Sequence, residues 1–154
     1  MCKIGALERN GIESPKWLLE SAQALFAKGT EFWAIDGVPG FVYTVDWNET
    51  PVVQERMHWV VTEAIGAAAV LFEYTQEGNY LDWQTKTERH LVEVFQTAPG
   101  SLRHEVGLTL EPSEQVWQGR PDIYHTVQAC LIPSVVNNSS LGLGLRNSTS
   151  QLPS

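Results

Sequence analysis

Apolar residues recur at helical spacing in four segments of the chain, over residues 13–31, 52–75, 80–97 and 121–132. The second segment carries no polar side chain between residues 64 and 71, so we expect that helix to be enclosed on most of its sides. The third segment has an apolar stripe and a charged opposite face, which is typical of a helix that covers an inner one. The pattern therefore predicts alternating enclosed and amphipathic helices.

Strand composition interrupts the helices in two places. Residues 40–47 are rich in β-branched and aromatic residues and lead into a turn, which predicts a short hairpin. In the region 99–118, which contains several glycines and prolines, short strands are predicted around 104–110 and 116–117. Residues 1–12 are interpreted as a leader, and polar residues dominate 134–154, which predicts a disordered tail.

The order of these elements indicates an all-α fold with short β-hairpins between the helices. Alternating inner and outer helices are typical of a toroid in which helical hairpins form an inner and an outer ring. The chain supplies about two such pairs, which are too few to close a ring. We therefore expect an incomplete helical toroid.

Charge and cysteine content narrow the classes of partner and compartment. The 154 residues carry a formal net charge of −8, which argues against binding to nucleic acid or to an anionic membrane surface. The sequence contains no run of about 18 apolar residues, so no transmembrane helix is predicted. Cys2 and Cys130 lie far apart, as in a reduced cytoplasmic protein. The six tryptophans are scattered, and we expect them in the core rather than in a carbohydrate site.

Several polar side chains lie within the enclosed helix predicted over 52–75. Arg56, Trp59 and Glu63 have the spacing i, i+3, i+7 and so share one face, where they could hold sugar hydroxyls beside an indole wall. His58 points about 100° away from Trp59. The structural alternative, which the residues alone favour, is a buried Arg56–Glu63 pair that positions the helix, with His58 bonded to a backbone carbonyl.

The last predicted helix places Asp122 and His125 one turn apart, with Gln128 at i+6. A carboxylate beside a histidine can fix its tautomer and raise its basicity, which suits general acid–base catalysis, although Asp122 also fits a helix-capping role. His90 is expected to be solvated on the outer helix, and His104 lies in a predicted hairpin that could face a cleft. The sequence has no HExxH or CxxC metal spacing, no phosphate-binding glycine loop and no GxSxG motif.

Four short segments occur in a fixed order: GFVYTVDW at 40–47, PVV at 51–53, RMHWVVTEA at 56–64 and GRPDIYHTVQA at 119–129. Together they resemble the N-acylglucosamine 2-epimerase superfamily, and most closely its branch of aldose–ketose (mannose) isomerases. The resemblance spans about residues 13–133. It implies an (α/α)6 barrel with the active site in the barrel mouth. There, two histidines move a proton between sugar C1 and C2 through an enediol, without metal, nucleotide or other cofactor.

The resemblance also implies roles for individual residues. One proton-transferring histidine of the family lies in the Pro-Asp-x-Tyr-His segment, so the catalytic role falls on His125. The Arg-x-His-Trp…Glu segment of the family lines the sugar pocket. The residues expected to bind a monosaccharide are Trp59, Glu63, Arg56, His58 and Asp122.

Three features depart from the family pattern. The other proton-transferring histidine belongs to a Pro-Gly-His segment that these 154 residues do not contain, Leu102 stands where tryptophan is usual, and Arg120 replaces a lysine. We therefore expect this chain to be the C-terminal part of the barrel, as a truncated gene product or gene model. Alone, it is expected to be inactive. One alternative is a non-catalytic remnant that binds sugar or self-associates through its exposed half-barrel surface. A glycan hydrolase or lyase ranks lower, because only Glu63 is a good candidate for its paired carboxylates.

Overall fold

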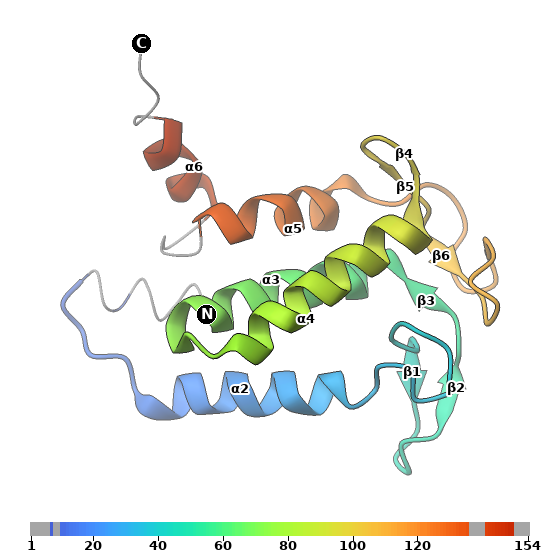
Figure 1. Cartoon of the computed structure of the whole chain (residues 1–154), viewed down its shortest axis with the longest axis horizontal. Helices are drawn as coiled ribbons and strands as arrows, with labels where there is room; N and C mark the ends of the chain where they lie inside the picture. The colour runs from blue at the N-terminus through green and yellow to red at the C-terminus, as the bar shows by residue number, and fades with distance from the viewer. Residues whose placement is uncertain (1–6, 8–9, 136–140, 150–154) are drawn as a thin grey trace.

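The computed structural model describes Leu7 and residues 10–135 and 141–149. Its helices are α2 (Lys16–Thr30), α3 (His58–Thr75), α4 (Gly78–His90), α5 (Ile123–Val135) and α6 (Leu141–Thr149), and a π-helical turn, η1 (Leu91–Phe95), follows α4. Its strands are β1 (Thr44–Val45), β2 (Pro51–Val53), β3 (Arg56–Met57), β4 (Gln96–Ala98), β5 (Ser101–Leu102) and β6 (Glu105–Val106). Figure 1 shows α3 and α4 in the middle, α5 and α2 on opposite sides of them, and the strands gathered at one end. The prediction of a helical fold with short strand pairs is confirmed.

Helix α3 is enclosed, as its uninterrupted apolar run predicts. Its buried residues include Ile65, Gly66 and the stretch from Ala68 to Leu71. A Cβ on Gly66 would meet the Cδ1 atom of Ile132 in α5 at 3.1 Å, so the glycine allows α5 to approach the backbone of α3 closely. The core cluster joins α3, η1, β6 and α5 through Val61, Ile65, Phe95, Val106 and Ala129.

The outer amphipathic helix predicted over 80–97 is divided into three elements. Helix α4 ends at His90, the π-helical turn continues to Phe95, and β4 begins at Gln96. The buried and exposed faces predicted for this segment are nevertheless correct, because Thr87 and Phe95 are buried whereas the charged side chains of the opposite face are exposed.

The strands form three antiparallel pairs. The hairpin expected from residues 40–47 is confirmed as β1 paired with β2, and β4 pairs with β5. Strands β3 and β6 are distant in sequence, and their register sets Arg56 opposite Val106 and Met57 opposite Glu105. The strand predicted at 116–117 is wrong, because that segment is a loop.

The start predicted for the enclosed helix is also wrong. Helix α3 begins at His58 rather than at residue 52, because β2 and β3 occupy most of the segment from Pro51 to Met57. Arg56 therefore lies in a strand, and its expected helical spacing with Trp59 and Glu63 does not exist.

The C-terminal region differs from its prediction at two points. Helix α5 continues through Pro133 to Val135 instead of ending before the proline. Residues 141–149 form helix α6, so the disorder predicted for 134–154 is wrong there. Residues 136–140 and 150–154, and most of the predicted leader (1–6 and 8–9), lie outside the described part.

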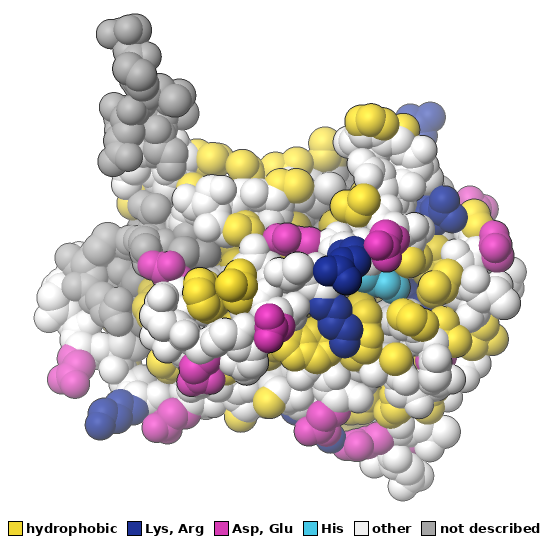
Figure 2. Space-filling model, viewed as in Figure 1, with side chains coloured by type: hydrophobic (Ala, Val, Ile, Leu, Met, Phe, Trp, Pro, Cys, Tyr) yellow, Lys and Arg dark blue, Asp and Glu magenta, His cyan; other side chains and the backbone are white. Residues whose placement is uncertain are grey.

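The two outermost helices of the bundle leave apolar faces uncovered. Helix α2 buries none of its residues, and Leu25 and Trp17 are 74% and 62% exposed. On α5, Ile123 is 76% exposed, and Figure 2 shows apolar side chains along that edge of the molecule. The expected core position of the tryptophans is wrong, because none of the six is buried and Trp47 is fully exposed. Among the described residues, no helix has both the length and the apolar character needed to cross a bilayer.

Arg56 is completely buried and fixes the loop that precedes β1. Its guanidinium pairs with the Asp36 carboxylate at 2.5 Å. It also donates hydrogen bonds to the backbone carbonyls of Val38, Pro39 and Gln54. Burial would raise the pKa of Asp36, but the bonds from Arg56 and the Val38 amide lower it overall. Arg56 therefore forms a buried ion pair with a structural role, as the structural alternative predicted, but its partner is Asp36 rather than Glu63.

His90 is buried, so its predicted solvation is wrong. Its ring contacts those of Trp33 and Phe95 at centroid distances of 4.9 and 5.9 Å. Its Nε2 atom has no hydrogen-bond partner among the described residues. Burial, followed by the positive charges of Arg56 and Lys86, lowers the pKa of His90 from 6.5 to about 4.

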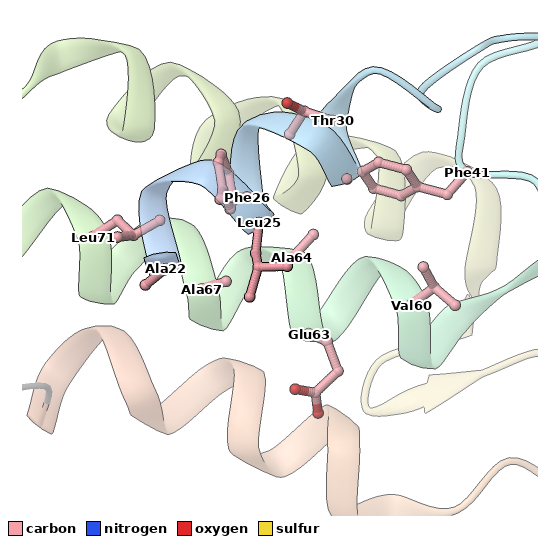
Figure 3. Close-up of a pocket in the computed structure, with 11 residues that line it drawn as sticks. Ala22, Leu25, Phe26, Thr30, Phe41, Val60, Glu63, Ala64, Ala67 and Leu71 are labelled. Atoms are coloured by element: carbon pink, nitrogen blue, oxygen red, sulfur yellow. The ribbon is translucent and has the colours of Figure 1, made fainter. Parts of the chain in front are cut away.

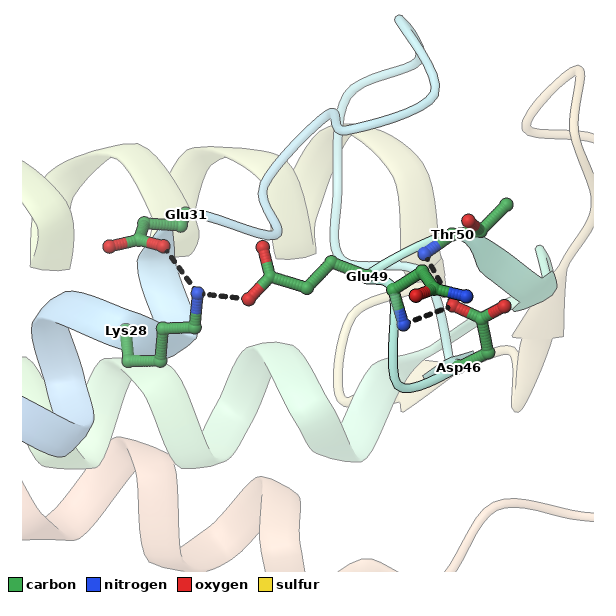
Figure 4. A network of polar contacts seen from close by, with 6 residues as sticks. Lys28, Glu31, Asp46, Glu49 and Thr50 are labelled. Atoms are coloured by element: carbon green, nitrogen blue, oxygen red, sulfur yellow. Dashed lines mark hydrogen bonds and ion pairs between the residues drawn. The ribbon is translucent and has the colours of Figure 1, made fainter.

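An exposed polar network joins the end of α2 to the β1–β2 turn (Figure 4). Lys28 pairs with Glu31 at 2.8 Å and with Glu49 in the turn. The Asp46 carboxylate accepts the amides of Asn48 and Thr50 at 2.8 and 2.9 Å. Because the lysine pairs are exposed to solvent and screened by it, they add little to the stability of the fold. The network mainly fixes the position of the β1–β2 turn relative to α2.

We predict that Gly40→Ala destabilises the protein by about 2–4 kcal/mol. Gly40 has φ +103°, and an added Cβ would lie 2.9 Å from Nε2 of His90 and 3.3 Å from Cγ of Arg56. Gly37→Ala is the matched control, because Gly37 has φ +85° but a Cβ added there would meet no atom within 4 Å. Urea unfolding should show a clearly larger loss for Gly40→Ala than for Gly37→Ala. Equal losses would contradict the crowded packing around Gly40.

We also predict an acid-dependent loss of stability from His90. Between pH 6.5 and about 4 the unfolded chain binds a proton at this histidine and the folded chain does not. The free energy of unfolding therefore falls as the pH is lowered through this window, by roughly 3 kcal/mol in total. His90→Gln lacks this titration, so the stability difference between wild type and variant should change across the window. A difference that stays constant from pH 7 to 4 would refute the neutral buried state.

Candidate active site

The polar residues of α3 and α5 meet where the two helices pack together. Nδ1 of His125 lies 2.8 Å from Oε1 of Glu63, and the side-chain amide of Gln128 donates to the same oxygen at 3.3 Å. In Figure 3 the Glu63 side chain points from α3 toward α5. The exposed fractions of the His125 and Glu63 side chains are 28% and 47%, so both remain accessible from solvent.

His125 belongs to the wall of a pocket of about 270 Å³. The lining residues are Trp59, His104, Trp117, Asp122 and His125. The Trp59 ring lies 5.8 Å from the His125 ring, tilted by 33°. Two indoles, two imidazoles and a carboxylate around one small cavity provide apolar faces and proton-exchanging groups together.

The carboxylate that contacts the His125 ring is Glu63 rather than Asp122. Because Nδ1 faces Glu63, Nε2 is the ring nitrogen left to exchange a proton with a ligand. The Asp122 carboxylate accepts the backbone amide of His125 at 3.2 Å, which is the helix-capping role. Partial burial would raise the pKa of Asp122, but this hydrogen bond and the nearby His125 and His58 rings lower it overall.

His58, the first residue of α3, is completely buried. Its backbone amide donates to the carbonyl oxygen of His104 at 3.1 Å, and its Nδ1 lies 3.2 Å from the same oxygen. Burial lowers the pKa of His58 more than the His104 carbonyl and the Asp122 carboxylate together raise it, so the ring is neutral at pH 7. The structural alternative, a histidine bonded to a backbone carbonyl, is therefore the observed one, and His58 is not among the residues that line the pocket.

The structure brings together four of the six residues expected at the site: Trp59, Glu63, Asp122 and His125. Arg56 is absent from the pocket lining because it lies in β3 and is fully bonded to the loop before β1. His104, expected to face a cleft, does line the pocket. Trp117 was missed, because its loop gives no periodic signal and its wall position depends on contacts with β6.

The loop that carries Trp117 is held by the buried carboxylate of Glu105. This carboxylate accepts the Ser113 hydroxyl at 2.6 Å and the backbone amides of Gln115, Val116 and Trp117 at 2.9, 3.1 and 2.8 Å. Burial would raise the pKa of Glu105, but these four donors lower it overall. Glu105 is therefore ionised at neutral pH although it is buried.

A second and more apolar groove of about 410 Å³ lies between α2 and α3 (Figure 3). Glu63 is the only ionisable residue in its lining, and the other lining residues, such as Leu25, Phe26 and Ala67, are apolar or small. This groove offers no pair of groups for acid–base chemistry. Among the residues that the structure describes, no three His, Cys, Asp or Glu side chains are grouped as metal ligands.

Comparisons with known proteins agree on one family. The sequence model of the N-acylglucosamine 2-epimerase (GlcNAc 2-epimerase) family matches residues 1–129. A D-mannose isomerase from Pseudomonas cannabina pv. alisalensis is 45% identical over 130 residues, which cover 83% of this chain and 31% of that protein. A D-mannose isomerase from Thermobifida fusca is 46% identical over 124 residues, which cover 79% of this chain and 30% of that protein.

A solved structure shows the same fold in part. A crystal structure of D-mannose isomerase superposes with a TM-score of 0.68 at 19% identity, covering 84% of this chain and 33% of that one. The chain thus spans about a third of the length of the relatives that it matches. From the extent of these matches, the chain belongs to the N-acylglucosamine 2-epimerase family.

Proposed function

We propose that this chain supplies part of the active site of a cofactor-independent sugar isomerase or 2-epimerase, with His125 as one acid–base residue. The observation that carries the proposal is the Glu63–His125 contact at 2.8 Å on the edge of a pocket lined by two indoles. The D-mannose isomerase relatives make a monosaccharide the proposed substrate. The outcome of the reaction, a ketose or a 2-epimer, depends on which face and carbon receive the proton.

The chemistry assigned to His125 is a proton transfer at the carbons next to the sugar carbonyl. A base removes the hydrogen at C2 of an open-chain aldose as a proton while the carbonyl oxygen O1 takes up a proton, and an enediol forms. Delivery of a proton to C1, with loss of the O2 hydroxyl proton, then gives the ketose. Glu63 holds the ring through Nδ1 and stabilises the imidazolium that forms when Nε2 takes up the proton. This arrangement is typical of a general base oriented by a carboxylate.

The remaining pocket residues are proposed to bind the sugar. The Trp59 indole offers an apolar face to the C–H side of the ring, next to His125. Asp122, on the same wall, carries a carboxylate that can accept hydrogen bonds from sugar hydroxyls. Arg56 and His58 are proposed to act on the fold rather than on the sugar, because both are fully buried by other parts of the chain.

We also propose that residues 13–133 correspond to the C-terminal part of an (α/α)6 barrel. Two observations support this. The apolar faces of α2 and α5 are uncovered, as expected where further barrel helices would pack. The relatives are about three times as long as the matched segment. In this proposal the second proton-transferring histidine comes from a Pro-Gly-His segment that the 154 residues lack.

A second candidate is a sugar-binding or self-associating remnant without turnover. The groove between α2 and α3 and the exposed Leu25 favour it, because large uncovered apolar surfaces promote association. Light scattering on the purified chain distinguishes a monomer from this outcome.

We predict that His125→Ala removes turnover by about 10²–10⁴-fold while leaving sugar binding largely intact. The test uses a chimera in which this chain replaces the matching segment of the Thermobifida fusca D-mannose isomerase, assayed for ketose formation from D-mannose. Cys130→Ala, exposed on the same helix, is the control and should keep full activity. The 154-residue chain alone should show no turnover. An active His125→Ala chimera, or an inactive wild-type chimera, contradicts the proposed function.

We predict that Glu63→Gln in the same chimera lowers kcat by about 10–100-fold with little change in KM. The amide can still accept a hydrogen bond from Nδ1 of His125, but it no longer stabilises the positive ring formed during proton transfer. Glu88→Gln, on the exposed face of α4, is the matched control. A loss confined to KM would show that Glu63 binds sugar and does not support the base.

A further inference from the structure

Glu105 is a charged side chain buried in a place where charge is costly. It is 1% exposed, and no basic side chain forms an ion pair with it among the described residues. Burying an unpaired carboxylate is unfavourable unless hydrogen bonds replace the lost water. Here four donors do so, and all come from one loop, residues 113–117.

Apart from this carboxylate, the loop amides have few partners: the Ser113 amide donates to the backbone carbonyl of Glu105 at 3.2 Å, and the Gln115 amide also lies 3.3 Å from the Ser113 hydroxyl. Residues 113–117 belong to no helix or strand, and a neutral residue at 105 could not accept all four of their donors. The Glu105 carboxylate therefore holds the loop in its observed conformation. Trp117, whose amide donates at 2.8 Å, is the last residue fixed in this way.

The fixed loop contributes to the wall of the pocket. Trp117 and His104 both line the pocket, and their rings lie 6.2 Å apart. His104 directly precedes Glu105, which pairs with Met57 across the β3–β6 ladder. The carbonyl of His104 in turn bonds His58 at the start of α3. One buried carboxylate thus ties the Trp117 wall to the helix that carries Trp59 and Glu63.

We propose that Glu105 is a positioning residue that holds Trp117 against His104 as the second wall of the sugar pocket. This proposal rests on the proposed function only for the identity of the ligand, because the position of Trp117 can be measured without sugar. Glu105 itself is too deeply buried to touch a ligand. Its effect on sugar binding therefore passes through Trp117 and His104.

The first experiment compares Glu105→Gln with Glu111→Gln in the full 154-residue chain. Glutamine keeps one acceptor oxygen and replaces the other with an amide group that cannot accept the Val116 and Trp117 amides. Hydrogen exchange at residues 115–117 should accelerate about tenfold or more in Glu105→Gln. Glu111, exposed in the same region, should change nothing.

The histidine ring resonances give a readout that general destabilisation would not reproduce. The chain has four histidines, so each ring signal can be followed. In Glu105→Gln the His104 signal should shift because the Trp117 ring leaves it, while the signal of His90, buried at the end of α4, stays in place. Should Glu105→Gln not fold, Ser113→Ala removes a single donor and should speed exchange at Gln115 in the same direction. Unchanged exchange at 115–117 and an unchanged His104 signal would overturn the proposal.

Binding of D-mannose to the full chain, followed by tryptophan fluorescence, tests the consequence for the pocket. Glu105→Gln and Trp117→Ala should each weaken binding about fivefold or more, and the double variant should be no weaker than Trp117→Ala. Additive losses would show that Glu105 does not act through Trp117, and would overturn the proposal. If wild type does not bind D-mannose, sugar binding requires segments that this chain lacks, and the exchange and histidine results still decide the role of Glu105.

Discussion

The close packing of α5 on α3 is the constraint on which the site depends. Gly66 removes the side chain that would keep Ile132 away, and the helices then run near enough for Glu63 to reach the His125 ring. Neither residue has a partner of this kind within its own helix. A larger residue at position 66 would separate the helices. The Glu63–His125 pair and the hydrophobic core therefore both depend on the close approach of α5 to α3.

Buried polar groups stabilise the end of the bundle where the strands lie. Arg56 is bonded to the loop before β1, His58 to the carbonyl of His104, and Glu105 to the loop before α5. Each replaces the hydrogen bonds that short, irregular backbone cannot make within itself. These groups shape the pocket without lining it, which explains why polar residues of one sequence motif, such as Arg56 and Glu63, have different roles.

Membership of the N-acylglucosamine 2-epimerase family supports the proposal of a longer barrel, which would explain the uncovered apolar surfaces. Within a longer barrel, the apolar faces of α2 and α5 would be interior contacts rather than surface. In the proposed barrel, other segments would contribute further groups to the pocket. The Trp59, His125 and Trp117 rings define three of its sides.

The sequence by itself determined helices α2, α3, α4 and α5, the enclosed position of α3, the amphipathic character of α4, and most of the residues of the site. Helical spacing of apolar residues reports which side of a helix is buried, and the three-residue spacing of Asp122 and His125 allows the Asp122 carboxylate to cap α5, which begins at Ile123. Only tertiary structure decided that Arg56 sits in a strand, because β3 exists through its pairing with β6. Tertiary structure also decided the burial of His90 and the hydrogen bonds between Glu105 and the loop at residues 113–117. These depend on contacts between segments far apart in the chain, and no local pattern of side chains encodes such contacts.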